Sequence, residues 1–373
     1  EGIISDMRAG ILLALNDIFP KVPNRICLMH FLRDLGKELM NDYYKGLDIA
    51  INRQRIKAPL KEILKSLPEY NVRTLYEIEQ GFCTSREILE EMGIRRILEV
   101  LFNSNGSSGY GFPFSLKTLN FYYACKEAEN KIQDLYLKVH ESSSKEIISE
   151  IMGKIKKVTD NENIRDLANK LSDINRLFQK LRFSFNIPEK GKLSDKLSED
   201  GQIQNNCNIL IGEMEVYMHE NIADHIFRAI KLITERYKER EKMLFANNKD
   251  QTIPRTNNGI EQFFRKIRRN VRKRYGNMAT GKALSEKGTL MALYQNMGNQ
   301  KYIATVFGTG SISAYFGKCR KQLKKKGISK KKIIELVERG MEMLLNDTIS
   351  DTPYTEEVMN MAYSSIENNK NIS

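Results

Sequence analysis

The sequence predicts a mainly α-helical protein with a small α/β part at its amino end. Apolar runs typical of strands are few, and they fall within the first 30 residues. From Phe31 to about Asn247, apolar residues recur almost everywhere at helical spacing. The chain has 373 residues, enough for two or three domains of about 100–200 residues each. We therefore expect a long helical region attached to a short strand-containing one.

The amino-terminal part is predicted to be strand, helix, strand. The first strand is "GIIS", and the second is "NRICLMH", which ends at His30. Between them, "MRAGILLALNDIF" predicts a helix that Pro20 and Pro23 terminate. Its apolar residues share one helical face: Ile11, Leu12, Leu15 and Ile18.

Helices fill most of the chain after Phe31. The segments with the clearest helical spacing are "TLYEIEQ", "SREILEEMGIRRILEVLF", "LNFYYACKEAENKIQDLYLKVH", "KEIISEIMGKIKKV" and "ADHIFRAIKLITERYKEREKMLF". Turn-rich stretches at 103–113 and 187–202 separate some of them. Further on, "IIELVERGMEMLL" supplies another apolar stripe after a lysine-rich segment. The tail after "SDTPYT" is polar.

The charge of the chain is concentrated in one part. The whole sequence has 60 Lys and Arg against 47 Asp and Glu, a net of +13. Residues 254–345 hold 21 of these bases and only 5 acids, a net of +16, so the other residues sum to −3. Such a basic segment favours a polyanionic partner, and nucleic acid before a membrane.

Cysteine usage and hydropathy indicate the cellular environment of the protein. The five cysteines are odd in number, scattered and without a C-x-x-C pair, which is typical of a reducing, intracellular compartment. No apolar run approaches the roughly 20 residues of a membrane span, so no membrane is expected as a partner.

The segment "PRTNNGIEQFFRKIRRNVRKRYG", residues 254–276, carries eight bases and one acid, Glu261. Ile260, Phe264, Ile267 and Val271 form the predicted buried stripe, and Glu261 lies beside it ahead of a row of arginines. Glu261 could cap the helix, since Asn258-x-x-Glu261 has capping-box spacing. It could instead be catalytic. The basic run could likewise be a solvated face or a contact to nucleic acid.

Two parts of the sequence together resemble DDE transposases of the Mutator-like and bacterial insertion-sequence type. In that family an aspartate ends a strand, a helix with Ala and a closing Phe-Pro follows, and the next strand carries C-x-x-H before an Arg. The matching residues here are Asp6, Ala14, Phe19, Pro20, Cys27, His30 and Arg33. The family's glutamate follows a Thr-Asn pair and precedes an Arg. Here the matching residues are Thr256, Asn257, Asn258, Glu261 and Arg265.

The resemblance implies a mainly α protein with a partial α/β RNase H-like core. A large helical insertion separates the last core strand from the helix that bears the glutamate. The implied divisions are a partial core at 1–37, the insertion at 38–250, the returning core helix at 251–298, and a basic helical region with its tail at 299–373.

The implied activity is metal-dependent cleavage and strand transfer of DNA. Asp6 and Glu261 would hold Mg²⁺ or Mn²⁺, so we expect their carboxylates within reach of one another. The family's first aspartate lies on an upstream strand, and without it this chain alone is expected to be inactive. Cys27, His30, Asn257 and Asn258 are expected near the site. The expected DNA contacts are Arg265, Lys266, Arg268, Arg269, Arg272, Lys273 and Arg274.

The partners implied are transposon ends and target DNA, with a homo-oligomer assembled on the DNA and a cytoplasmic, nucleoid-associated location.

Other interpretations stay open. Asp6 could be an ordinary cap after a strand. Cys27 and His30 could bind zinc, although no further ligand pair lies near in the sequence. The cluster at 317–332 could contact phosphate or be solvated. The whole chain could be a non-catalytic DNA-binding protein or a helical scaffold.

Overall fold

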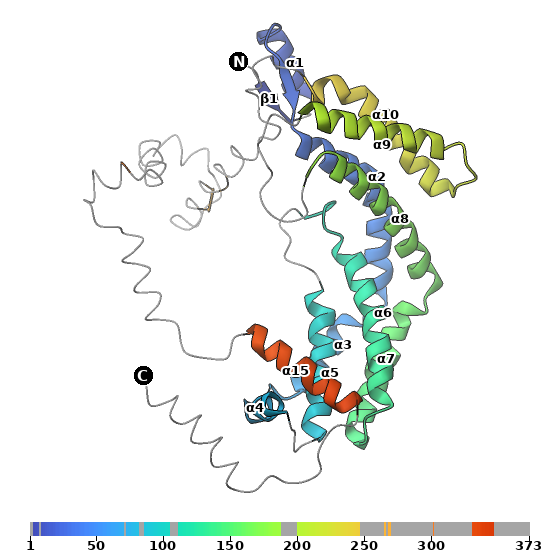
Figure 1. Cartoon of the computed structure of the whole chain (residues 1–373). Helices are drawn as coiled ribbons and strands as arrows, with labels where there is room; N and C mark the ends of the chain where they lie inside the picture. Colours follow the sequence, from blue (N-terminus) through green and yellow to red (C-terminus); the bar gives the residue numbers. More distant parts are fainter. Residues whose placement is uncertain are drawn as a thin grey trace. The chain divides into compact units, whose positions relative to one another are not determined.

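The structure is a computed structural model of the chain (Figure 1). It describes residues 3–6, 9–70, 72–81, 86–104, 111–187, 200–246, 265, 268, 269, 301 and 330–346. Within these residues the protein is mainly α-helical, as predicted, and contains two short strands. The chain divides into two compact units, one formed by 1–30 and 243–327, the other by 31–242 and 328–373.

The first unit contains a parallel β–α–β arrangement. Strand β1 (Ile3–Ser5) pairs with β2 (Asn24–Ile26), and helix α1 (Ala9–Ile18) connects them. Ile4 lies opposite Arg25 in the register, and the Ser5 Oγ donates a hydrogen bond to the Asn24 Oδ1 at 2.9 Å. A helical crossover is what two parallel strands require.

The predicted apolar face of α1 is only partly covered. Leu12 and Leu15 are half-buried, while Ile11 is 40% exposed and Ile18 is 66% exposed. A pair of three-residue strands offers a helix little surface to pack on, so only the middle of the face is covered within the described part.

The second strand is shorter than predicted. It ends at Ile26, and helix α2 (Leu28–Arg53) begins two residues later, so the prediction of a strand through His30 was wrong. The reason is the spacing of buried apolar residues, which include Leu28, Phe31, Leu32 and Leu35. These recur at intervals of three and four, so they form one buried face only in a helix.

The second unit is an array of helices. After α2 come α3 (Lys57–Ser66), α4 (Val72–Gln80), α5 (Arg86–Asn103), α6 (Lys117–Tyr136), α7 (Ser142–Thr159), α8 (Glu162–Ser184), α9 (Asp200–Tyr217), α10 (Asp224–Leu244) and α15 (Lys330–Leu345). The predicted breaks at 103–113 and 187–202 both fall between helices of this array, after α5 and after α8. The helical segments predicted between Phe31 and about Asn247 are confirmed, and so is the one at "IIELVERGMEMLL". The helices predicted at 251–298 lie almost wholly outside the described residues.

Close packing holds these helices together. Helix α6 packs against α5 and α7, and α8 packs against α9. Gly36 of α2 has no side chain, and Pro113 and Phe178 pack directly against its backbone. A Cβ added at this position would lie only 2.5 Å from the Pro113 Cγ. The rings of Phe31 and Phe185 meet edge to face at 5.8 Å between centroids.

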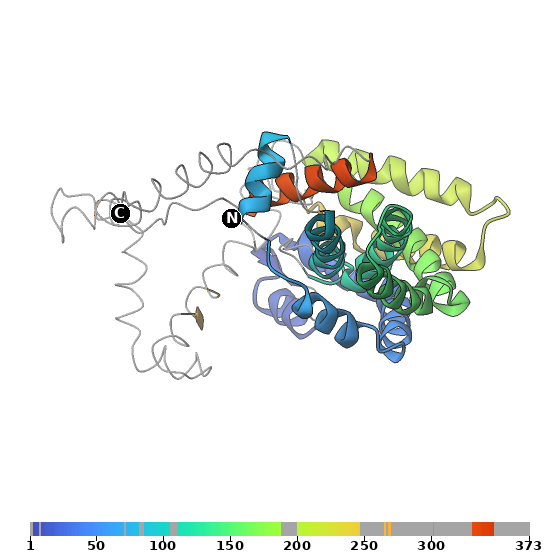
Figure 2. The same ribbon diagram turned by 90° about the horizontal axis from the view of Figure 1, so that it is seen from below.

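Helix α15 returns from the carboxy-terminal part of the chain to pack against α4 and α5. Both views show it in red beside the light blue α4 (Figures 1 and 2). Its Leu336 and Val337 join Ile78 of α4 and Leu89 of α5 in one buried cluster. Two ion pairs flank the cluster, Arg96–Glu338 and Lys332–Glu79, both at 2.7 Å. The segment assigned from the sequence to a separate region at 299–373 thus contributes a helix to this array.

Candidate functional site

Asp6 directly follows β1, at the carboxyl end of the parallel strand pair. The Cys27 backbone N–H donates a hydrogen bond to the Ser5 carbonyl at 2.9 Å, so the ends of both strands are held together there. Asp6 is half-buried, so part of its side chain meets solvent. In open α/β sheets, the crevice outside the carboxyl ends of the strands is where ligands bind. Asp6 therefore stands at the edge of the sheet that suits a functional carboxylate.

Cys27 and His30 lie close to this edge through the backbone. The side chain of Cys27 is fully buried. His30 lies in the first turn of α2, and its backbone N–H donates to the Cys27 carbonyl at 3.0 Å. Among the residues the structure describes, no group of three His, Cys, Asp or Glu side chains could hold a metal ion.

Arg25 is a residue of this region that the sequence analysis does not single out. It lies in β2, opposite Ile4, and is only 2% exposed. A guanidinium cannot lose its charge in a protein, so burial requires compensating partners. The arginine directly precedes the apolar run from Ile26 to Met29, and this position is the signal that could have drawn attention to it.

Most of the other predicted site residues lie outside the described residues. These are Asn257, Asn258, Glu261, Lys266, Arg272, Lys273 and Arg274. Arg265, Arg268 and Arg269 are described, and all three are helical and exposed. Exposed arginines can contact phosphates. The structure thus describes the Asp6 half of the predicted site.

Asp6 meets the chemical requirement of the metal that the resemblance implies. Mg²⁺ and Mn²⁺ prefer hard oxygen ligands, and a carboxylate at the end of a strand supplies them while leaving positions for water. The position and partial exposure of Asp6 fit this role.

The chain was compared with models of protein families, with curated proteins and with solved structures, and none of them matches it. None of the helices within the described residues is long and apolar enough to cross a membrane.

Proposed function

We propose that the chain is part of a DDE-type DNA transposase with an RNase H-like core. In this proposal the complete protein cuts DNA strands and transfers them to a target, and it acts as an oligomer on DNA. The observation that carries the proposal is the position of Asp6, which follows β1 at the carboxyl end of a parallel β–α–β arrangement. The catalytic aspartate of the resembling family has the same place in its motif.

A second observation supports the proposal. The compact unit that contains β1 and β2 also includes residues 243–327. Glu261 falls in that part of the chain, 255 positions after Asp6. A division of this kind is what an interrupted core requires, since the residues before and after the insertion belong to one unit.

The roles of the residues follow from their chemistry. Asp6 and Glu261 would bind the divalent ion, which polarises the reacting phosphodiester oxygens when bound. The exposed Arg265, Arg268 and Arg269 would position the DNA through its phosphates and carry no sequence preference. The resemblance places a further aspartate on an upstream strand.

Strand cleavage of labelled duplex DNA in Mg²⁺ tests the proposal, using the protein joined to the upstream strand that the resemblance implies. Asp6→Asn and Glu261→Gln should each abolish cleavage and leave DNA affinity nearly unchanged, because each removes one negative metal ligand and no phosphate contact. Asp17→Asn, at an exposed position of α1, is the control and should cleave normally. Normal cleavage by both site variants would overturn the proposal. DNA binding without any cleavage would favour the non-catalytic alternative.

A further inference from the structure

Cations gather where α2 ends and along α3, in the second compact unit. Residues 53–66 contain five bases against one acid, Glu62. The five, which we call the α3 cationic surface, are Arg53, Arg55, Lys57, Lys61 and Lys65. All are exposed except Lys57, which is half-buried.

The lysines of this surface form a row. Lys57, Lys61 and Lys65 recur every four residues of α3, so they lie on one side of the helix at steps of about 6 Å along its axis. Two of the ammonium groups lie over aromatic rings. The Lys57 Nζ is 4.9 Å from the centroid of the Phe121 ring, and the Lys61 Nζ is 5.5 Å from that of Phe102.

Hydrogen bonding orders the first of these lysines further. The Lys57 Nζ donates to the Asn52 Oδ1 at 2.9 Å, and an ammonium has two further N–H donors. The side chain is therefore held in place before any ligand arrives, which lowers the entropy cost of binding.

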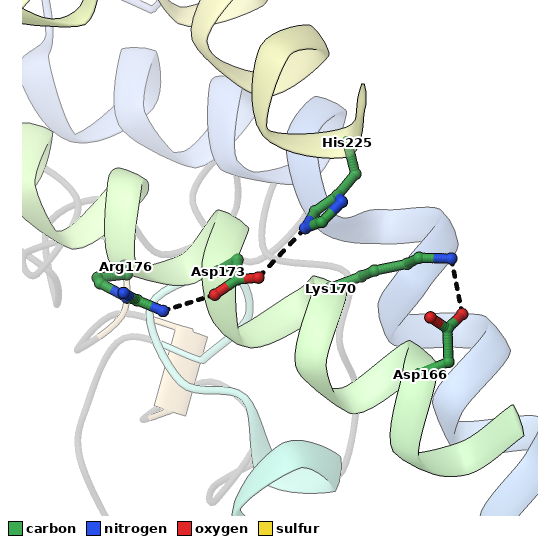
Figure 3. Close-up of polar contacts among 5 residues, drawn as sticks. All are labelled: Asp166, Lys170, Asp173, Arg176 and His225. Carbon is green, nitrogen blue, oxygen red and sulfur yellow. Dashed lines mark hydrogen bonds and ion pairs between the residues drawn. The ribbon is translucent and has the colours of Figure 1, made fainter. Parts of the chain in front are cut away.

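Several cations elsewhere in this unit pair with carboxylates. In α8, Lys170 pairs with Asp166 at 2.7 Å and Arg176 pairs with Asp173 at 2.5 Å (Figure 3). Asp173 also contacts the His225 Nε2 of α10 at 3.2 Å. Similar pairs within one helix are Lys131–Glu127, Lys154–Glu150 and Arg228–Asp224.

The α3 cationic surface lacks this matching. Among the described residues, no carboxylate forms an ion pair with Arg53, Arg55, Lys57, Lys61 or Lys65, and none of the five has a further hydrogen bond to another side chain there. Like charges at spacings of four residues repel one another on a helix. An external polyanion bound to these cations would supply the missing negative charge and so explain the arrangement.

We infer that the α3 cationic surface binds the phosphate backbone of duplex DNA. The described part of α3 exposes no large apolar side chain, whereas helices that bind membranes insert such side chains. The choice of DNA over RNA rests on the proposed function. A helical segment about 200 residues before the basic segment at 254–276 thereby supplies a second contact to DNA.

The test compares two triple variants of equal charge change in the full chain. The surface variant is Arg53→Gln, Lys61→Gln and Lys65→Gln. The control is Lys131→Gln, Lys170→Gln and Arg228→Gln, which removes three cations that each have a carboxylate partner. Both leave a net charge of about +10. Lys57 is kept because, unlike the three substituted residues, it is half-buried and hydrogen-bonded to Asn52.

Duplex DNA binding is measured over a range of salt concentrations. Each phosphate that the protein no longer neutralises reduces the slope of log K against log salt by about 0.9, so the surface variant should flatten the slope by up to about 2.7. Its affinity should fall about tenfold or more near 0.1 M salt, while the control changes little. Equal slopes and affinities for the two variants would overturn the inference, as would tighter binding of an RNA duplex. Loss of binding only to phosphatidylserine vesicles would assign the surface to a membrane instead.

A second measurement uses the unaltered protein, in case the surface variant fails to fold. Acetylation of lysines is followed by mass spectrometry with and without duplex DNA. Lys61 and Lys65 should be protected by DNA, and Lys131 and Lys170 should react equally in both samples. Equal reactivity of all four would contradict the inference. Cleavage is not read in either experiment, so the proposed catalytic function can fail while this surface stands, and the reverse also holds.

Discussion

The Cys27 backbone N–H donates a hydrogen bond to the Ser5 carbonyl at 2.9 Å, immediately beyond the last paired residues of β1 and β2. This bond continues the parallel ladder to the point where both strands end, and it fixes the backbone on which Asp6 is carried. The carboxylate is thus attached to an ordered strand end, which is the support that a catalytic or metal-binding group needs.

The buried thiols of the helical array provide a prediction about pH. Burial raises the pKa of Cys125 from its ordinary 9.0 to about 12, and burial together with Glu241 raises the pKa of Cys207 to about 12. In the folded protein both thiols stay protonated at pH 8, so neither should react with iodoacetamide, while both should react in guanidinium chloride. Labelling of either residue in the native protein at pH 8 would contradict this.

The same raised pKa values predict a loss of stability in alkali. The stabilisation is complete below pH 9, where the unfolded thiols are also protonated, and it is lost as the pH rises towards 12. Between these values the unfolded chain releases protons that the folded chain keeps. The melting temperature should therefore fall from pH 9 to 10, and the fall should be shallower in a Cys125→Ala, Cys207→Ala variant. An identical pH dependence for both proteins would show that these thiols ionise normally.

Substitution of Gly340 tests whether α15 packs against α4 and α5. An added Cβ there would lie 2.8 Å from the Ile78 Cδ1 and 3.0 Å from the Leu89 Cδ2, and both side chains are buried. Gly340→Ala should lower the free energy of unfolding by about 1–3 kcal/mol, as overpacking does. Gly153→Ala in α7 is the matched control, since nothing lies within 4 Å of its added Cβ.

The control should gain about 0.5–1 kcal/mol, because alanine is the better helix former. Urea unfolding of the two variants measures both values. Equal stabilisation of both variants would show that α15 does not pack on α4 and α5 in solution.

The basic segment at 254–276 predicts a steep dependence of DNA binding on salt. Replacing Arg268, Arg269, Arg272 and Lys273 with Ala should flatten the slope of log K against log salt by up to about four, if each contacts one phosphate. Binding should weaken to a similar extent on unrelated DNA sequences, since phosphate contacts carry no sequence information. An unchanged slope would place the DNA on another part of the protein.

Much of the fold could be predicted because its signals are local. Helical spacing and turn-rich breaks identified the helices, and "IIELVERGMEMLL" marked α15 with its buried Leu336 and Val337. The docking of α15 on α4 could not be predicted, since nothing in either segment specifies a partner so far away in the chain. The second strand was extended too far because a run of apolar residues around Leu28 fits a strand as well as a buried helix.

Only part of the candidate functional residues could be predicted from the sequence. Asp6 could be found because it follows an apolar strand and belongs to a motif. The α3 cationic surface could not, because the net charge of −3 outside residues 254–345 hides five bases within 53–66. Their significance depends on which carboxylates lie near them in space. Composition averaged over hundreds of residues contains no such information.

Whether Asp6 and Glu261 share a divalent ion is tested most directly by the binding of Mn²⁺, followed by electron paramagnetic resonance. Asp6→Asn and Glu261→Gln should each weaken Mn²⁺ binding about tenfold or more, because an amide keeps the size of the side chain but not its charge. Asp17→Asn should bind as the unaltered protein does. If Glu261 only caps a helix, Glu261→Gln should cost at most about 0.5–2 kcal/mol of stability and leave Mn²⁺ binding unchanged. Unchanged Mn²⁺ affinity in both Asp6→Asn and Glu261→Gln would contradict the proposed metal site.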